Sequence, residues 1–161
     1  MLTAAELGAL LKPPLRAVVV ERAESTNTSL MRMAATGAAE GTVLLALSQS
    51  AGRGQRGRTF YSPAGCGLYM SLLLRPRMRP EDALAVTPAA AVAAAQAIEA
   101  AAGRPAGIKW VNDIQIEGKK VCGILTESAS SAGSLDCIVC GIGIDLCPPP
   151  GGWPAELEGK A

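Results

Sequence analysis

The sequence predicts an α+β fold in which helices pack on a mixed, largely antiparallel β-sheet. Apolar and β-branched runs of strand length outnumber the helical patterns along the chain. Several of these runs are separated by turns of a few residues, a connection that joins antiparallel neighbours. Helical and strand patterns do not alternate strictly, so the repeated βαβ units of a parallel sheet are not expected. With 161 residues, the chain has the size of one domain, 1–161.

The first half of the chain is predicted to hold two short helices and three strands. A capping-box pattern at residues 3–6 begins the first helix, and Pro13 ends it. Ser25 or Thr26 can cap the second helix with its side-chain oxygen. The expected elements, in order, are a helix from residue 3, a strand at 16–22, a helix from 25 or 26 to 33, and strands at 42–47 and 67–75.

The second half is predicted to hold one long helix and a hairpin. Thr87 is a suitable N-cap and Pro88 a suitable first residue for an alanine-rich helix that Gly103 ends. The expected elements, in order, are this helix to 102, a β region from 108, hairpin strands at 114–117 and 119–126, an apolar strand at 135–146 and a loop at 148–154.

Net charge and residue usage exclude several classes of function. The formal net charge is +1, so no global field favours nucleic acid or an anionic membrane. The sequence has no histidine, which excludes Ser-His-Asp and Cys-His nucleophiles and metal binding by histidine. Catalysis must therefore rest on lysine, arginine, carboxylates, backbone amides or a bound metal ion.

The five cysteines do not form the pattern of a disulfide framework. Cys137 and Cys140 have a C-x-x-C spacing, but they lie in an apolar strand, where residues three apart face opposite sides. We expect buried core cysteines there and not zinc ligands. The sequence has no signal-peptide pattern and no run of ~18 apolar residues, which favours a cytoplasmic protein without a membrane span.

Residues 51–58 carry three glycines and three arginines between two apolar runs. Glycine lets backbone amides approach a ligand and arginine presents a planar fork of donors, so we expect an anion-binding loop. Gly52, Gly54 and Gly57 match G-x-G-x-x-G, but a strand follows instead of the helix that a dinucleotide fingerprint requires. A solvated basic turn and a segment that contacts RNA are the alternatives; scarce aromatic residues weigh against RNA.

Three further clusters have plain structural explanations when they are taken singly. Residues 25–27 can cap a helix, residues 112–113 suit a turn, and the lysines at 119–120 suit an edge strand. The glycines within the apolar run 141–145 indicate that another group lies against the backbone there.

Taken in order, these clusters resemble the biotin protein ligases, the biotin–[acetyl-CoA-carboxylase] ligases. The matching segments are Glu24-Ser25-Thr26-Asn27, residues 49–58, Ser62-Pro63, Lys109-Trp110-Val111-Asn112-Asp113, residues 120–127 and Gly141-Ile142-Gly143-Ile144-Asp145. They cover nearly the whole chain from about residue 18 onward. The resemblance implies a core similar to those of class II aminoacyl-tRNA synthetases and lipoate ligases.

The resemblance implies an enzyme that joins biotin to ATP, releases pyrophosphate and holds biotinyl-5′-AMP. The biotinyl group then passes to a lysine of a biotin carboxyl carrier protein. The attacking carboxylate is already ionised, so the absence of histidine is no obstacle to the first step. Cations must stabilise charge on the phosphate, and Mg²⁺ is implied, with direct ligands that the sequence does not identify. No DNA or membrane partner is implied, and a homodimer is left open.

The resemblance also implies roles for particular residues. The expected catalytic residues are Lys120, Arg53 and Asp113. The expected biotin-binding residues are Ser25, Thr26, Asn27, Gln49, Arg53, Gly54, Gln55, Lys120, Gly123 and Ile124. The expected nucleotide-binding residues are Arg56, Arg58, Lys109, Asn112, Gly141, Gly143 and Asp145. Neutral polar side chains in the biotin set suit the ureido ring of biotin, which is itself neutral.

The sequence departs from the family's pattern at three residues and in length. Gln55 stands where some members carry arginine, which is expected to weaken retention of the adenylate. Val111 replaces the commoner proline, and Asp145 replaces the usual asparagine and adds negative charge near the nucleotide. Family members continue past Pro154 into a further helix and a small β-barrel, so we expect a C-terminally truncated chain. No N-terminal helix-turn-helix pattern is present, so a repressor role is not expected.

Two rival functions share the expected pocket. One is a lipoate- or octanoate-type protein ligase, whose arginine–triple-glycine and histidine-containing signature is absent from this sequence. The other is a non-catalytic fragment that binds biotin or its adenylate without turnover.

Overall fold

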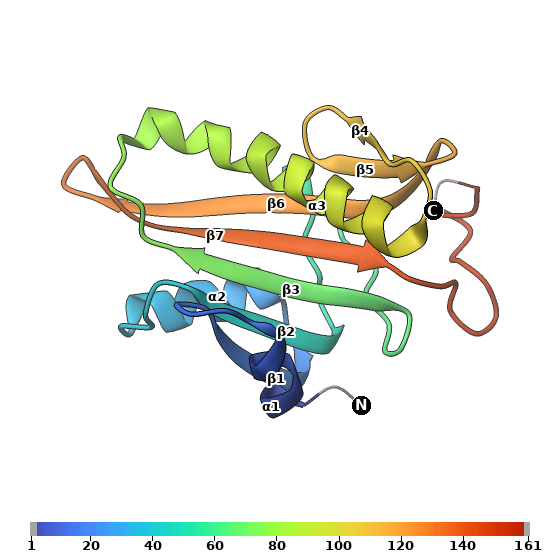
Figure 1. Ribbon diagram of the computed structural model, residues 1–161, viewed down its shortest axis with the longest axis horizontal. Coiled ribbons are helices and arrows are strands. Elements are labelled where there is room, and N and C mark those ends of the chain that lie inside the picture. Colours follow the sequence, from blue (N-terminus) through green and yellow to red (C-terminus); the bar gives the residue numbers. More distant parts are fainter. Residues whose placement is uncertain (1–2, 160–161) are drawn as a thin grey trace.

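A seven-stranded β-sheet forms the centre of the computed structural model, which describes residues 3–159 (Figure 1). The strands are β1 Arg16–Ala23, β2 Thr42–Gln49, β3 Gly67–Leu74, β4 Gly107–Lys109, β5 Asp113–Ile116, β6 Lys119–Ser131 and β7 Ser134–Asp145. Their order in the sheet is β1-β2-β3-β7-β6-β5-β4. β1 and β2 pair in parallel and all other neighbours pair antiparallel, which confirms the predicted fold class.

The helices begin where the sequence offers a cap, with one exception. The helices and 3₁₀ turns are α1 Ala4–Leu10, α2 Thr26–Ala35, α3 Val86–Ala102, η1 Gln55–Gly57 and η2 Pro80–Ala85. The capping box of Thr3 and Glu6 is present at α1. Ser25 caps α2, because its hydroxyl accepts a hydrogen bond from the backbone N–H of Thr28 at 3.5 Å.

The exception is the start of α3, where the prediction is wrong. The 3₁₀ turn η2 leads directly into α3, whose N-cap position is Ala85 and not Thr87. Thr87 lies within the helix, where it is buried and its hydroxyl contacts the hydroxyl of Thr126 on β6. A partner on the sheet has therefore replaced the local cap that the sequence favours. Gly103 ends the helix with a φ of 64°, as predicted.

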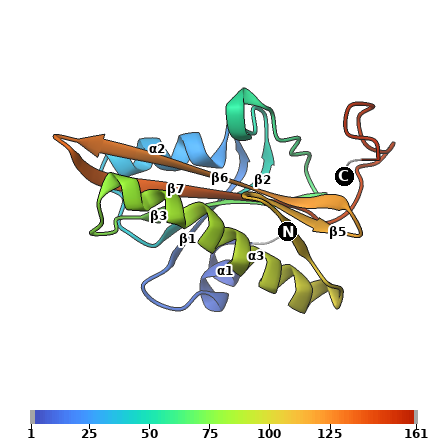
Figure 2. The same cartoon turned by 90° about the horizontal axis from the view of Figure 1, so that it is seen from above.

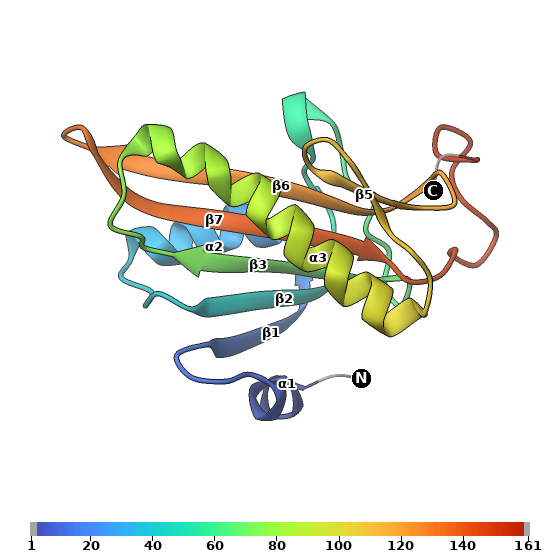
Figure 3. The same ribbon diagram turned by 45° about the horizontal axis from the view of Figure 1, so that its top comes forward.

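The sheet separates two hydrophobic clusters, and α2 and α3 cover opposite faces of it (Figure 2). On one face, α2 packs on β2, β3 and β7 and buries a cluster that includes Leu30, Leu73 and Val139. On the other face, α3 lies obliquely across β6 and β7 (Figure 3) and packs through its alanines and Ile98. The small alanine side chains let the helix approach the sheet closely.

Cys137 and Cys140 confirm the alternation expected of β7. Both are buried, Cys137 in the cluster under α2 and Cys140 in the cluster under α3. The two thiols cannot share a metal ion across the sheet, and burial raises the pKa of the Cys140 thiol to about 11. By the same alternation, Gly141 and Gly143 face the α2 side. The connection between β2 and β3 rises above the sheet on that side (Figure 2).

Residues Pro80–Ala102 are long and apolar enough, by length and composition alone, to cross a membrane, with a mean hydropathy of 1.4. In the fold, this stretch presents a buried face to the sheet that includes Ala91, Ala94, Ala95 and Ile98. Packing on the sheet therefore accounts for the apolar residues on the buried face of α3, since a helix that covers a sheet needs such a face.

Candidate active site

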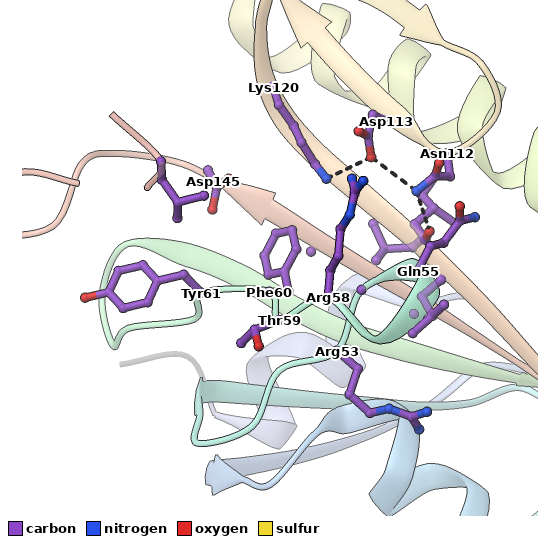
Figure 4. A pocket seen from close by; sticks show the side chains of 18 of the residues that line it. Arg53, Gln55, Arg58, Thr59, Phe60, Tyr61, Asn112, Asp113, Lys120 and Asp145 are labelled. Atoms are coloured by element: carbon purple, nitrogen blue, oxygen red, sulfur yellow. Dashed lines mark hydrogen bonds and ion pairs between the residues drawn. The ribbon is translucent and has the colours of Figure 1, made fainter. Parts of the chain in front are cut away.

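A cavity of about 740 Å³ lies on the α2 side of the sheet. Its floor is formed by β6 and β7, and its walls are formed by β5, the connection between β2 and β3, and the segment after β7. In Figure 4, Arg58 of that connection points toward Lys120 and Asp113 on the opposite wall. The arginine loop, defined here as residues 51–58, and Lys120 therefore share one cavity.

Folding brings together nearly all of the residues predicted for the site. The predicted residues that line the cavity are Ser25, Thr26, Gln49, Arg53, Gly54, Gln55, Arg56, Arg58, Lys109, Asn112, Asp113, Lys120, Gly123, Ile124, Gly141, Gly143 and Asp145. Asn27 is the predicted site residue that the lining does not include. The sequence clusters that have plain structural explanations when taken singly thus lie around a single cavity.

Asn27 is the predicted biotin-binding residue that lies behind the lining of the cavity, and its contact with biotin stays a prediction. Its amide donates to the carbonyl oxygen of Leu125 and to Glu127 Oε2, both at 3.0 Å. Its Oδ1 accepts from Ser71 Oγ at 2.6 Å. The second position of α2 points toward the sheet, where the absence of a side chain at Gly141 leaves room for the amide.

Ile124 borders the cavity, but its side chain belongs to the core under α3, where it is 2% exposed. Strand alternation turns the neighbouring Gly123 toward the cavity instead. Any contact that Ile124 makes with a ligand therefore comes from its backbone.

One end of the cavity is neutral and polar. Gln49 Oε1 accepts from the backbone N–H of Thr26 at 2.8 Å and from its hydroxyl at 3.2 Å. Gln49 Nε2 donates to Ser62 Oγ at 2.8 Å. These bonds fix which way the Gln49 amide faces. The resulting wall of Ser25, Thr26 and Gln49 offers neutral donors and acceptors and no charge.

The arginine loop is shaped by local backbone contacts. The N–H of Gly54 donates to the carbonyl oxygen of Arg58 at 2.7 Å, and the N–H of Phe60 donates to that of Gly52 at 2.8 Å. A Cβ at Gly52 would lie 2.3 Å from the Phe60 carbonyl oxygen, so only glycine fits there. Within residues 3–159, the guanidinium groups of Arg56 and Arg58 have no hydrogen-bond or ion-pair partner, so both are available to an anion.

Lys120 forms the cationic centre of the opposite wall. Its Nζ lies 2.8 Å from Asp113 Oδ1 and 5.8 Å from the centre of the Phe60 ring. Asp113 Oδ1 also accepts from Asn112 Nδ2 at 3.2 Å, and that amide donates to the carbonyl oxygen of Ile124 at the same distance. Lys120 and Asp113 are therefore oriented toward each other by a network that starts on the backbone of β6.

Asp145 lies in the same cavity at the end of β7, and its carboxyl is poorly solvated. Burial raises its pKa from the usual 3.8 to about 6, while the charge of Lys120 acts in the opposite direction. Because the folded state binds the proton more tightly than the unfolded state, this residue lowers the free energy of unfolding as the pH rises from about 4 to 6.

We therefore expect Asp145→Asn to stabilise the protein by about 1–2 kcal/mol at pH 7.5, allowing for the partial exposure of the carboxyl. At pH 3, where the carboxyl of Asp145 is largely protonated in both the folded and the unfolded state, the two proteins are expected to be equally stable. Urea unfolding of both proteins at the two pH values measures this difference. An identical change at both pH values would contradict the buried-carboxylate explanation.

Aromatic residues line the cavity, although none of them was among the residues predicted for the site. Four of the five aromatic residues in the chain are among its lining: Phe60, Tyr61, Trp110 and Trp153. The Phe60 ring covers Gly123 and Gly143, where a Cβ would lie 3.0 Å and 2.6 Å from it. The Tyr61 and Trp153 rings meet edge to face with centroids 6.5 Å apart. Their scarcity and their position beside the motifs were the signals available in the sequence.

The described residues contain no group of three or more Asp, Glu, Cys or His side chains arranged to hold a metal ion. Asp113 and Asp145 both line the cavity; Asp113 pairs with Lys120, and the charge of Lys120 also acts on Asp145. One or two carboxylates are enough for Mg²⁺ when substrate phosphates and water supply the remaining ligands. The residues present therefore fit a magnesium ion that arrives with a nucleotide.

Comparisons with known proteins identify the family of this chain. The model of the biotin/lipoate A/B protein ligase family matches residues 19–145. The bifunctional ligase/repressor BirA of Bacillus subtilis is 42% identical over 134 residues, which are 83% of this chain and 41% of that protein.

Two solved structures extend the likeness to the fold. The biotin protein ligase of Aquifex aeolicus in complex with biotin and ATP has a TM-score of 0.70 and 30% identity, over 90% of this chain and 57% of that one. The biotin protein ligase of Leishmania major in complex with biotinyl-5-AMP has a TM-score of 0.70 and 29% identity, over 86% of this chain and 60% of that one.

The chain spans about two fifths of the Bacillus relative and about three fifths of the two solved ligases. The matched region nevertheless contains the whole sheet except its first residues, and it contains every residue predicted for the site. On this evidence, the chain belongs to the biotin/lipoate A/B protein ligase family.

Proposed function

We propose that this chain is the catalytic core of an ATP-dependent biotin protein ligase, which forms biotinyl-5′-AMP and transfers the biotinyl group to a lysine of a biotin carboxyl carrier protein. The observation that carries the proposal is a single cavity with a neutral polar end and a cationic end. Biotin has a neutral urea at one end and a carboxylate at the other, and its adenylate adds a phosphate next to the carboxyl carbon.

The neutral end suits the ureido ring. Gln49 is held by Thr26 and Ser62, so its amide faces the ligand in one orientation. A fixed amide discriminates by hydrogen bonding, because a ligand without matching groups leaves buried polar atoms unpaired. Phe60 and the glycines that it covers offer an apolar surface for the carbon atoms of the ligand.

The cationic end suits adenylate formation. The biotin carboxylate attacks the α-phosphorus of ATP, a phosphorus–oxygen bond forms, and pyrophosphate leaves with the electrons of the bond that breaks. Lys120 on one wall and Arg56 and Arg58 on the other can reduce the repulsion between the two anions and stabilise the transition state. When bound with the nucleotide, Mg²⁺ would neutralise phosphate charge, with Asp113 and Asp145 as the carboxylates within its reach.

The second step transfers the acyl group to an amine. The ε-amine of the acceptor lysine must lose a proton before it attacks the carbonyl carbon of the adenylate, and AMP is then released. Asp113 is the candidate for orienting that amine, since its carboxylate lies on the cavity wall beside Lys120. We propose a cytoplasmic location together with this function.

The test is biotin-dependent release of pyrophosphate from Mg·ATP by the purified chain, followed by transfer to a carrier domain with its acceptor lysine intact or replaced by arginine. We expect release with biotin, and transfer only to the intact carrier. Release with lipoate or octanoate and not with biotin would instead assign the other activity of the family. Biotin binding by calorimetry without pyrophosphate release would identify a non-catalytic binding fragment.

A further inference from the structure

Glu127 contacts two parts of the site without lining the cavity. Its Oε1 lies 2.9 Å from Arg53 Nη1, and its Oε2 lies 3.2 Å from the same nitrogen. Asn27 Nδ2 donates to Oε2 at 3.0 Å. One carboxylate on β6 therefore joins the arginine loop to the first turn of α2.

The body of the protein fixes this carboxylate independently of Arg53. Asn27 is 3% exposed, and its amide is held by the carbonyl oxygen of Leu125 at 3.0 Å and by Ser71 Oγ at 2.6 Å. With one N–H of Nδ2 bound to Leu125 and Oδ1 bound to Ser71, the second N–H of the Asn27 side chain points toward Glu127. An acceptor that is already in place loses less conformational entropy when the arginine binds it.

Arg53 is the loop residue that makes this connection. The hydrogen bonds of Gly54 and Phe60 stay within the loop and its flank. In the described part of the chain, the side chains of Arg56 and Arg58 make no polar contact with the sheet. Figure 4 shows Arg53 pointing away from Lys120 and Asp113, whereas Arg58 points toward them.

We propose that Glu127 is a positioning residue, which anchors Arg53 and thereby holds the arginine loop over the cavity. Arg53 then acts as the anchor of the loop and not as a contact to the ligand's phosphate. Arg56, Arg58 and the backbone of Gly54 are left to face the ligand. The identity of the ligand under the loop rests on the proposed ligase function. The ion pair between Arg53 and Glu127 does not, because it is present without a ligand.

The test compares Glu127→Gln, Arg53→Met and the double variant. Glutamine keeps the size of the side chain and an oxygen that accepts from Asn27, but it removes the charge that holds Arg53. Asp82→Asn is the matched control, because it removes a carboxylate from another exposed ion pair with arginine, outside the cavity. Urea unfolding checks that all variants are folded.

The first measurement is amide hydrogen exchange of residues 52–58 in the ligand-free protein. The ion pair is partly exposed, with 51% of the Arg53 and 26% of the Glu127 side chain accessible, so a modest effect is expected. We expect exchange to become about three- to tenfold faster in each single variant, with no further increase in the double variant. The control is expected to match the parent. An unchanged exchange rate in Glu127→Gln would show that Glu127 does not hold the arginine loop in place.

The second measurement is the rate at which preformed biotinyl-5′-AMP leaves the protein. If Arg53 acts only through Glu127, both single variants and the double variant release it faster by the same factor. If Arg53→Met releases it much faster while Glu127→Gln behaves like the parent, Arg53 is a direct ligand contact and the proposal is wrong. A parent that forms no adenylate refutes the proposed function, and the exchange measurement still decides the anchor.

Discussion

Lys120→Ala is expected to lower the rate of biotin-dependent pyrophosphate release by about 100- to 1000-fold. The same substitution is expected to change the free energy of unfolding by less than about 1 kcal/mol, because the side chain is partly exposed. We therefore predict a large loss of pyrophosphate release together with a small change in the free energy of unfolding. A residue that only supports the hairpin would change both quantities together.

The physical reason lies in the charges around Lys120. Its Nζ stands 2.8 Å from Asp113 Oδ1, and its charge also acts on the carboxyl of Asp145. Removal of the lysine leaves two carboxylates at the point where a carboxylate and a triphosphate have to meet. The cavity end would then repel both substrates and would lack a cation for the transition state.

Lys119→Ala is the matched control. Lys119 is the neighbouring residue on β6, it is exposed, and it is not part of the cavity lining. We expect this variant to retain the parent's rate of pyrophosphate release. Equal losses in the two lysine variants would mean that the charge of the hairpin matters and the position of Lys120 does not.

Gly141→Ala is expected to destabilise the protein by about 2–4 kcal/mol. A Cβ at this position would lie 2.1 Å from Asn27 Oδ1. Asn27 cannot move aside without loss, because its amide is bound to Leu125, Glu127 and Ser71. The methyl group must therefore displace a buried side chain and leave its polar partners unpaired.

Urea unfolding measures this effect, with Gly107→Ala as the control. Gly107 also lies in a strand, but the nearest atom to a Cβ there is the carbonyl oxygen of Gln115 at 4.0 Å. We expect the control to stay within about 0.5 kcal/mol of the parent. If Gly141→Ala were as stable as the control, Asn27 would not be fixed in the way described.

The sheet was predictable because its signals are local. A continuous apolar run identified β7, and Gly118 marked the turn between β5 and β6. The start of α3 was not predictable in this way. Thr87 has the side chain of a good cap, but its hydroxyl contacts Thr126, which lies 39 residues away in the sequence. A pattern read over a few residues contains no information about such a partner.

The lining of the site was predictable for a different reason. The order and spacing of the motifs resemble one family, and the structure brings those motifs around one cavity. The roles of Phe60, Trp153 and Glu127 were missed, because each depends on what faces it across the fold. Phe60 lies against two strand glycines, Trp153 against Tyr61, and Glu127 against Arg53.

The sequence by itself determined the mixed sheet, the family and the kinds of chemical group available, because these follow from periodicity, motif order and residue type. Only the tertiary structure decided that Asn27 stands behind the wall, that Ile124 turns to the other face and that Arg53 pairs with Glu127. Each of these outcomes depends on which residues meet in the folded protein. Asn27 and Glu127, for example, are 100 residues apart in the chain, but Asn27 Nδ2 lies 3.0 Å from Glu127 Oε2. The energies of burial and of hydrogen bonding depend on distances in space, and a local sequence pattern does not contain those distances.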